Sequence, residues 1–231
     1  KCKYPLMVQR FVALAYPPDA APPIDCPKPR LTVETMQQTE TLRAFGLKNG
    51  SRVIGICPGA EFGPAKQWPA EHYAELVNDL LDKGREVWFF GSSKDALMVE
   101  SILADVEPSL LPKCKNLTGR TSLGQAIDLL AATEAVVSND SGLMHIAAAL
   151  KKPVIVIYGS TTPDFTPPLA DRVKLLSTEV ECRPCFERTC PFGHLRCLKE
   201  LRPELAIDAA AELLEAANVS TEATETRLRM L

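Results

Sequence analysis

From residue 34 onward, stretches with helical spacing alternate with short apolar stretches, and this alternation limits the fold more than any other feature of the chain. Helices are predicted over residues 34–45, 70–83, 94–105, 122–132 and 142–150, and strands over residues 53–57, 87–90, 135–138, 154–157 and 173–176. The strand over 154–157 is a continuous apolar run, which is typical of parallel sheets buried on both faces. Because the connections are short, the pattern predicts an α/β fold with a Rossmann-like, doubly wound parallel sheet.

Both ends of the chain differ from this alternating region. Residues 5–16 are amphipathic and a proline-rich stretch follows them, which predicts a helix that runs into a stiff connector. A domain seldom begins in this way, so we expect a folded part upstream of this sequence and interpret residues 1–33 as a linker. Residues 34–202 are then the binding domain. Residues 203–231 are a final helix and tail, and we expect the helix over 203–217 to pack back toward the linker.

The charge and hydropathy of the chain exclude several functions. The 231 residues carry a formal net charge of −3, and lysine and arginine are scattered, which argues against a nucleic-acid groove. No apolar run approaches the roughly 20 residues of a membrane-spanning helix, and the first residues lack the layout of a signal peptide. We therefore expect a soluble, cytoplasmic protein that associates at most peripherally with a membrane.

The loops that follow the strands form the expected binding region, because doubly wound sheets bind ligands at the carboxyl ends of their strands. These loops follow Cys57, Phe90, Ser138 and Ile157. The sequence contains neither a Gly-x-Gly-x-x-Gly motif after the first strand nor a Gly-x-x-x-x-Gly-Lys-Ser/Thr motif. The absence of these motifs argues against a nicotinamide-dependent oxidoreductase and against a P-loop enzyme. A different nucleotide ligand is therefore favoured.

The loop after the first strand, residues 57–69, contains two glycines and one lysine. Glycines permit a close approach of the backbone to a ligand, and Lys66 supplies a compact cation. The alternative is that Lys66 is a solvated loop lysine. Spacing alone does not separate these two interpretations, whereas Trp68 is interpreted as a core side chain in both.

The turn over residues 139–145 carries polar groups from a strand into a helix. The amides of Ser141 and Gly142 would lie at the helix N-terminus, where unpaired N–H groups and the helix dipole favour a phosphate. His145 follows Ser141 by four residues and would reach the same anion or a sugar hydroxyl. The alternative is that Asp140 or Ser141 merely caps the helix and His145 is a core histidine.

Four of the eight cysteines form a Cys-x2-Cys-x4-Cys-x6-Cys cluster, namely Cys182, Cys185, Cys190 and Cys197. This spacing would suit a structural metal, either tetrahedral zinc or an iron–sulfur cluster. A disulfide staple or unlinked thiols are the alternatives. The other four cysteines are dispersed and support no disulfide framework.

Four segments, taken in order and spacing, resemble the ADP-heptose:lipopolysaccharide heptosyltransferases of glycosyltransferase family 9. These segments are residues 57–69, 90–95 (Phe-Gly-Ser-Ser-Lys-Asp), 116–121 (Asn-Leu-Thr-Gly-Arg-Thr) and 138–145 (Ser-Asn-Asp-Ser-Gly-Leu-Met-His). The resemblance covers about residues 4 to 217. It is greatest to the type II enzymes of the family, through Pro-Gly-Ala-Glu-Phe-Gly-Pro-Ala-Lys and the loop over 162–169.

The resemblance implies a GT-B architecture, in which two Rossmann-like domains face each other across a cleft. This chain would be the C-terminal, donor-binding domain with its linker, and the acceptor-binding N-terminal domain would be its missing partner. The implied reaction is the inverting transfer of heptose from ADP-heptose to a heptose of the lipopolysaccharide inner core, with no cofactor required. The family's catalytic carboxylate belongs to the N-terminal domain, so no catalytic base is expected in this chain.

The resemblance also assigns roles to residues of the donor site. Lys66 would contact the donor and stabilise the leaving group, and its replacement by alanine would weaken ADP binding without changing stability. The other implied donor-binding residues are Gly59, Ala60, Glu61, Thr121, Asp140, Ser141, Gly142 and His145. An alternative from another class is a non-catalytic nucleotide-binding module or a metal-stapled regulatory domain that uses the same helix-end anion site.

Overall fold

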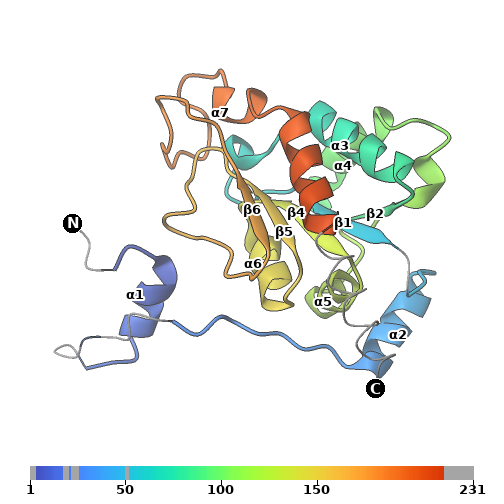
Figure 1. The fold of residues 1–231 in the computed structure, drawn as a ribbon, viewed down its shortest axis with the longest axis horizontal. Helices are drawn as coiled ribbons and strands as arrows, with labels where there is room; N and C mark the ends of the chain where they lie inside the picture. The colour runs from blue at the N-terminus through green and yellow to red at the C-terminus, as the bar shows by residue number, and fades with distance from the viewer. Residues whose placement is uncertain (1–3, 18–20, 22–25, 50–51, 216–231) are drawn as a thin grey trace.

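The computed structural model describes residues 4–17, 21, 26–49 and 52–215, and it confirms the predicted doubly wound α/β sheet (Figure 1). Within these residues, one six-stranded sheet has the order β3-β2-β1-β4-β5-β6, and all neighbouring strands are parallel. The strands are β1 (Val53–Cys57), β2 (Glu86–Phe89), β3 (Cys114–Asn116), β4 (Ala135–Asn139), β5 (Val154–Ile157) and β6 (Val173–Leu176).

Strand β3 is the one strand of this sheet that the sequence pattern did not predict. It has only three residues, Cys-Lys-Asn, and pairs with β2 at the edge of the sheet. Its residues are partly or fully exposed, so an apolar run is not required there. A three-residue polar edge strand carries no periodicity that would distinguish it from a loop.

The order of the strands creates a switch point between β1 and β4. The chain winds outward from β1 through β2 to β3, and then returns to form β4 on the other side of β1. The carboxyl ends of β1 and β4 therefore lie side by side, with Cys57 paired to Ser138. Because the loops leaving such a pair of strands diverge, this is where folds of this class open a crevice.

Helices cover both faces of the sheet, and successive strand residues point to opposite faces. On one face, Ile54, Ile56 and Phe89 pack with α3 (Ala70–Asp82), α4 (Ala96–Ala104) and the helix over 203–215. On the other face, Val53, Trp88 and Phe90 pack with α2 (Thr35–Ala44), α5 (Leu123–Ala131) and α6 (Gly142–Ala149). The remaining elements are the short helices α1 (Met7–Ala13) and α7 (Arg196–Lys199) and the 3-10 turns η1 (Pro64–Lys66), η2 (Ser93–Asp95) and η3 (Leu111–Lys113).

The expected packing of the C-terminal helix toward the linker is wrong for the described residues. The helix over 203–215 buries Ala206, Ala209 and Ala210 against the face that α3 and α4 cover (Figure 1). The small side chains of this stripe let the helix lie close to the sheet. Helix α1 instead lies beside the loop after β5, where the Met7 amide donates to the Phe165 carbonyl at 3.0 Å. Residues 216 and 217 of the expected helix lie outside the described residues.

The described residues include no helix with the length and apolar character that a membrane span requires.

Candidate functional site

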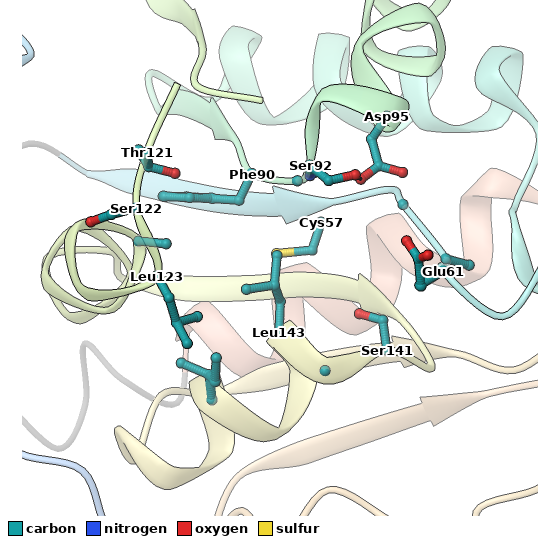
Figure 2. A pocket seen from close by; sticks show the side chains of 16 residues that line it. Cys57, Glu61, Phe90, Ser92, Asp95, Thr121, Ser122, Leu123, Ser141 and Leu143 are labelled. Carbon is teal, nitrogen blue, oxygen red and sulfur yellow. Dashed lines mark hydrogen bonds between the residues drawn. The ribbon is translucent and has the colours of Figure 1, made fainter. Parts of the chain in front are cut away.

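A cavity of about 380 Å³ opens at the switch point, between the carboxyl ends of β1 and β2 and the first turns of α5 and α6 (Figure 2). It is lined by segments of four loops, at residues 59–61, 90–92, 121–123 and 141–143. A second cavity of about 310 Å³ lies beside it and shares Glu61, Ser141 and Gly142. Together they form one cleft, which we call the switch-point cleft.

All nine residues implied for the donor site line this cleft. Gly59, Ala60 and Thr121 border the first cavity alone. Lys66, Asp140 and His145 border the second cavity alone, and the other three residues border both. The expected convergence of loops about 75 residues apart is therefore present in the structure.

The two cavities differ in chemical character. Cys57, Phe90, Leu123 and Leu143 point toward the middle of the first cavity and give it an apolar floor (Figure 2). Its hydroxyls and carboxylates stand at the rim, where Figure 2 shows Thr121 and Ser122 at one end and Glu61 near the other. The first cavity thus suits a flat, mainly apolar group, and the second cavity suits charged groups.

Lys66 is held in a nearly buried ion pair. Its Nζ lies 2.6 Å from Oδ2 of Asp140, and the two side chains are 12% and 4% exposed. The Thr161 hydroxyl donates to the same carboxylate oxygen at 2.7 Å, and Nζ stands 4.8 Å from the centre of the Phe62 ring. The interpretation of Lys66 as a solvated loop lysine is therefore wrong.

Asn139, which sequence reasoning did not single out, fixes the distance between the two charged loops. This fully buried side chain donates to the Pro58 carbonyl at 2.5 Å and accepts from the Tyr73 hydroxyl at 3.0 Å. It thereby ties the end of β4 to the start of the loop that carries Lys66. A polar residue that ends an apolar strand is the sequence signal that could have revealed it. Trp68 is fully buried, as expected, and its indole donates to the Leu201 carbonyl at 2.8 Å.

The N-terminus of α6 faces the second cavity, and in the described structure the side chain of its N-cap residue, Ser141, does not bond to the first amides of the helix. The Ser141 hydroxyl lies 3.2 Å from that of Ser138. A Cβ built on Gly142 would meet no described atom within 4 Å. The interpretation of Ser141 as an ordinary helix cap is therefore wrong, and the turn offers open space beside its backbone.

His145 lies one turn into α6, is exposed to solvent and borders the second cavity. Burial lowers its pKa, the nearby charge of Lys66 lowers it further, and Asp140 opposes both effects. The lowered pKa favours the uncharged imidazole, which can donate one hydrogen bond and accept another. Its place on a cavity wall argues against a purely structural histidine.

Asp95, the last residue of the 90–95 segment, is not among the implied donor-binding residues, but it forms a wall of the first cavity. Its carboxylate accepts from the Ser92 amide at 2.8 Å and from the Ser92 hydroxyl at 2.9 Å. This is a capping box, so the Ser-x-x-Asp spacing was the available signal. Glu61 pairs with Lys94 at 2.7 Å on the exposed rim, which lowers the pKa of the Glu61 carboxyl.

The cysteine cluster lies in the loop between β6 and α7, residues 177–195, and extends into α7. The structure describes seven of the eight cysteines, all of them as free thiols. Burial, followed by the charges of Cys182, Cys185 and Cys190, raises the pKa of Cys197. Among the described residues, however, no three cysteine, histidine or acidic side chains stand where they could hold one metal ion.

Comparison with known proteins places these features in a family context. Residues 1–196 match the model of glycosyltransferase family 9 (heptosyltransferase). Lipooligosaccharide heptosyltransferase 2 of Haemophilus influenzae is 46% identical over 222 residues, which cover 93% of this chain and 64% of that protein. Lipopolysaccharide heptosyltransferase 2 of Escherichia coli K12 is 40% identical, over 91% of this chain and 62% of that protein.

The structure of E. coli ADP-heptose lipopolysaccharide heptosyltransferase II superposes with a TM-score of 0.81 at 39% identity, over 93% of this chain and 63% of that one. The chain thus spans a little under two thirds of the length of each of these relatives.

Proposed function

The chain belongs to glycosyltransferase family 9, the heptosyltransferases, and from this premise we propose that its switch-point cleft binds ADP-heptose as the donor of a heptosyl transfer. The observation that carries the proposal is that Lys66 and the N-terminus of α6 meet in the second cavity, next to the first cavity with its apolar floor. A nucleoside diphosphate sugar has matching parts, a flat base and a pair of phosphates.

In this proposal the adenine lies in the first cavity, above Phe90 and Leu143. Apolar side chains favour the faces of the base, and the hydroxyls of Thr121 and Ser122 stand where its polar edge would emerge. Both hydrogen bonds from Ser92 go to Oδ2 of Asp95, so Oδ1 of the same carboxylate can accept from a ribose hydroxyl.

The diphosphate then lies between Lys66 and the first amides of α6. The helix N-terminus contributes N–H donors and the positive end of its dipole. Lys66 has three donors, so it can keep Asp140 and still bond a phosphate oxygen. Asp140 holds the ammonium in place and offers an acceptor for a sugar hydroxyl, and His145 can bond the heptose as an uncharged donor.

The proposed reaction is an inverting transfer of heptose to a heptose of the lipopolysaccharide inner core. As the bond from heptose to the diphosphate breaks, negative charge grows on the leaving oxygen. Lys66 and the helix amides stabilise that charge more in the transition state than in the ground state. The acceptor hydroxyl would be deprotonated by a carboxylate of an N-terminal domain, and a membrane-bound acceptor would bring the protein to the cytoplasmic face of the inner membrane.

Calorimetric titration of the purified chain with ADP and with ADP-heptose tests the donor site. We expect saturable binding of both, with one site per chain, and weaker binding of GDP, because guanine would bring a more polar base edge to a cavity with an apolar floor. Equal affinity for all nucleotides would reduce the proposal to a general phosphate site. Absence of any binding would contradict it. No observation favours the alternative of a non-catalytic or metal-stapled regulatory module.

A further inference from the structure

The loop over residues 177–195, which carries three of the clustered cysteines, contributes no side chain to the switch-point cleft but contacts the segments that build it. We call it the cysteine loop. Its backbone and two of its arginines bond to residues 61–65 on one side and to residues 159–161 on the other. The first segment, residues 61–65, directly precedes Lys66. The second segment, residues 159–161, includes Thr161, whose hydroxyl donates to Asp140.

Arg183 makes the densest set of these contacts. Its guanidinium donates from Nε to the Gly159 carbonyl at 2.6 Å, from Nη2 to the Thr161 carbonyl at 2.8 Å and from Nη1 to the Thr178 carbonyl at 2.8 Å. The amide of Phe186 donates to the Ser160 carbonyl at 2.8 Å. All three carbonyls of the turn over 159–161 are thus bonded by the cysteine loop.

The turn over 159–161 in turn holds the charged pair of the cleft. The Thr161 hydroxyl donates to Asp140 Oδ2, the same oxygen that Lys66 contacts. The Ser160 amide donates to the Ala65 carbonyl at 3.0 Å, and the Ala65 amide donates to the Arg188 carbonyl at 3.1 Å. Ala65, which precedes Lys66, is therefore held at both of its backbone groups: its carbonyl bonds to the turn over 159–161, and its amide bonds to the cysteine loop.

The contacts of the turn are close as well as numerous. A Cβ built on Gly159 would lie 2.4 Å from the Ala65 carbonyl oxygen, so this glycine allows the two segments to touch. Ser160 is 1% exposed and Thr161 is 7% exposed, so water does not replace these bonds readily. A shift of the turn would consequently move both members of the ion pair.

We infer that Arg183 is a positioning residue for the donor site, acting through the turn over 159–161 to hold Asp140 against Lys66. The inference rests on the proposed function, because the pair matters only if the diphosphate binds beside it. An arginine is required because one planar guanidinium reaches three carbonyls in fixed directions, which an ammonium does not. Burial lowers the pKa of this guanidinium, but an arginine side chain stays charged at any physiological pH.

Replacement of Arg183 tests the inference in the 231-residue chain. Arg183→Ala should raise the Kd for ADP about tenfold, the scale of coupling between residues of one hydrogen-bond network. Arg183→Lys, which keeps the charge, should also weaken ADP binding. If Arg183→Ala does not fold, the lysine variant carries the test, and wild-type affinity in that variant would overturn the inference.

Arg172→Ala is the matched control, because Arg172 also donates to a backbone carbonyl, that of Leu213, but on the helix over 203–215. We expect Arg172→Ala to lower the melting temperature and to leave the Kd for ADP unchanged. If Arg172→Ala weakens ADP binding as much as Arg183→Ala does, the effect of Arg183 is a general loss of stability and the inference fails.

A second measurement separates positioning from stability. Thr161→Val removes the bond from the turn to Asp140. If Arg183 acts through this bond, adding Arg183→Lys to Thr161→Val should change the Kd for ADP by less than twofold. Fully additive effects would overturn the inference. Failure of the wild-type chain to bind ADP would instead contradict the proposed function, so the two failures are distinguishable.

Discussion

At the residue scale, the cleft depends on an ion pair whose members, Lys66 and Asp140, come from loops 74 residues apart. Both side chains are nearly buried, so each charge has lost most of its hydration and relies on the other. Removing one partner leaves a buried charge uncompensated, which costs more than the pair contributes. The expectation that Lys66 could be replaced without loss of stability must therefore be revised.

We predict that Lys66→Ala weakens ADP binding by about 1.5–3 kcal/mol, the range for charge-assisted hydrogen bonds. The Asp140 carboxylate would then also repel the phosphates, because its counter-ion is gone. Stability should fall by up to about 3 kcal/mol, since breaking a buried pair is destabilising. Calorimetry with ADP and urea unfolding measure the two quantities separately.

The double variant Lys66→Met with Asp140→Asn is the control for this prediction. It removes both charges at nearly constant volume, so most of the lost stability should return. ADP affinity should stay low, because the cation that binds the phosphates is still absent. Recovery of ADP affinity in the double variant would show that Lys66 serves only to neutralise Asp140.

How far the sequence predicts the site can be seen in these same residues. Parallel sheets bind ligands at the carboxyl ends of their strands, and this rule predicts from the sequence alone that Lys66 and His145 lie in one cleft. It does not predict that Lys66 faces Asp140, because that contact depends on the path of η1 and on the bond from Thr161. The role of Arg183 is hidden for the same reason, since its partners are backbone carbonyls that any sequence supplies.

At the element scale, the loop after β1 and the turn η2 approach each other closely at the first cavity. A Cβ built on Gly59 would lie 2.4 Å from the Asp95 carboxyl group. The Asp95 side chain cannot move aside cheaply, because Ser92 holds it through its amide and its hydroxyl. The absence of a side chain at residue 59 is therefore what allows the two loops to form one wall.

We predict that Gly59→Ala displaces η2 and weakens ADP binding by at least fivefold, with a loss of stability of about 1–3 kcal/mol as in other overpacked sites. Gly124→Ala is the matched control, because a Cβ there would meet only the Ser122 hydroxyl, 4.0 Å away. Gly124 lies within α5, so alanine should raise stability by about 0.5–1 kcal/mol and leave ADP affinity unchanged. Unchanged ADP affinity in Gly59→Ala would contradict the prediction.

The elements themselves differ in how far the sequence predicts them. Strands β1, β4 and β5 are fully buried, so their apolar runs identify them, and the Ser122 capping box marks the start of α5. The edge strand β3 and the packing of the helix over 203–215 depend on tertiary neighbours, which local patterns do not encode. The loop geometry at Gly59 likewise depends on the contact between the loop after β1 and the turn η2, so the sequence of either segment alone does not predict it.

At the scale of the whole molecule, the switch-point cleft offers groups that suit the proposed donor, and each of its carboxylates is already engaged by a neighbouring side chain. Among the described residues that line it, Asp140 is bonded to Lys66 and Thr161, Asp95 to Ser92, and Glu61 to Lys94. Lys94 lowers the pKa of the Glu61 carboxyl, and the bonds that Asp140 and Asp95 accept hold those two carboxylates in fixed positions. We therefore predict that the general base for the acceptor hydroxyl is not a carboxylate of this cleft.

We predict that the 231-residue chain binds ADP-heptose but transfers no heptose to a lipopolysaccharide acceptor that ends in an inner-core heptose. Mass spectrometry of the acceptor after incubation measures this, with the full-length E. coli relative as positive control. If the proposed N-terminal domain supplies the acceptor side and the carboxylate, fusing that domain of the relative ahead of the chain should produce transfer. Turnover by the 231-residue chain alone would show that one of the bonded carboxylates of the cleft acts as the base. Asp140→Asn, which keeps the side-chain volume, would then abolish that turnover if Asp140 were the group responsible.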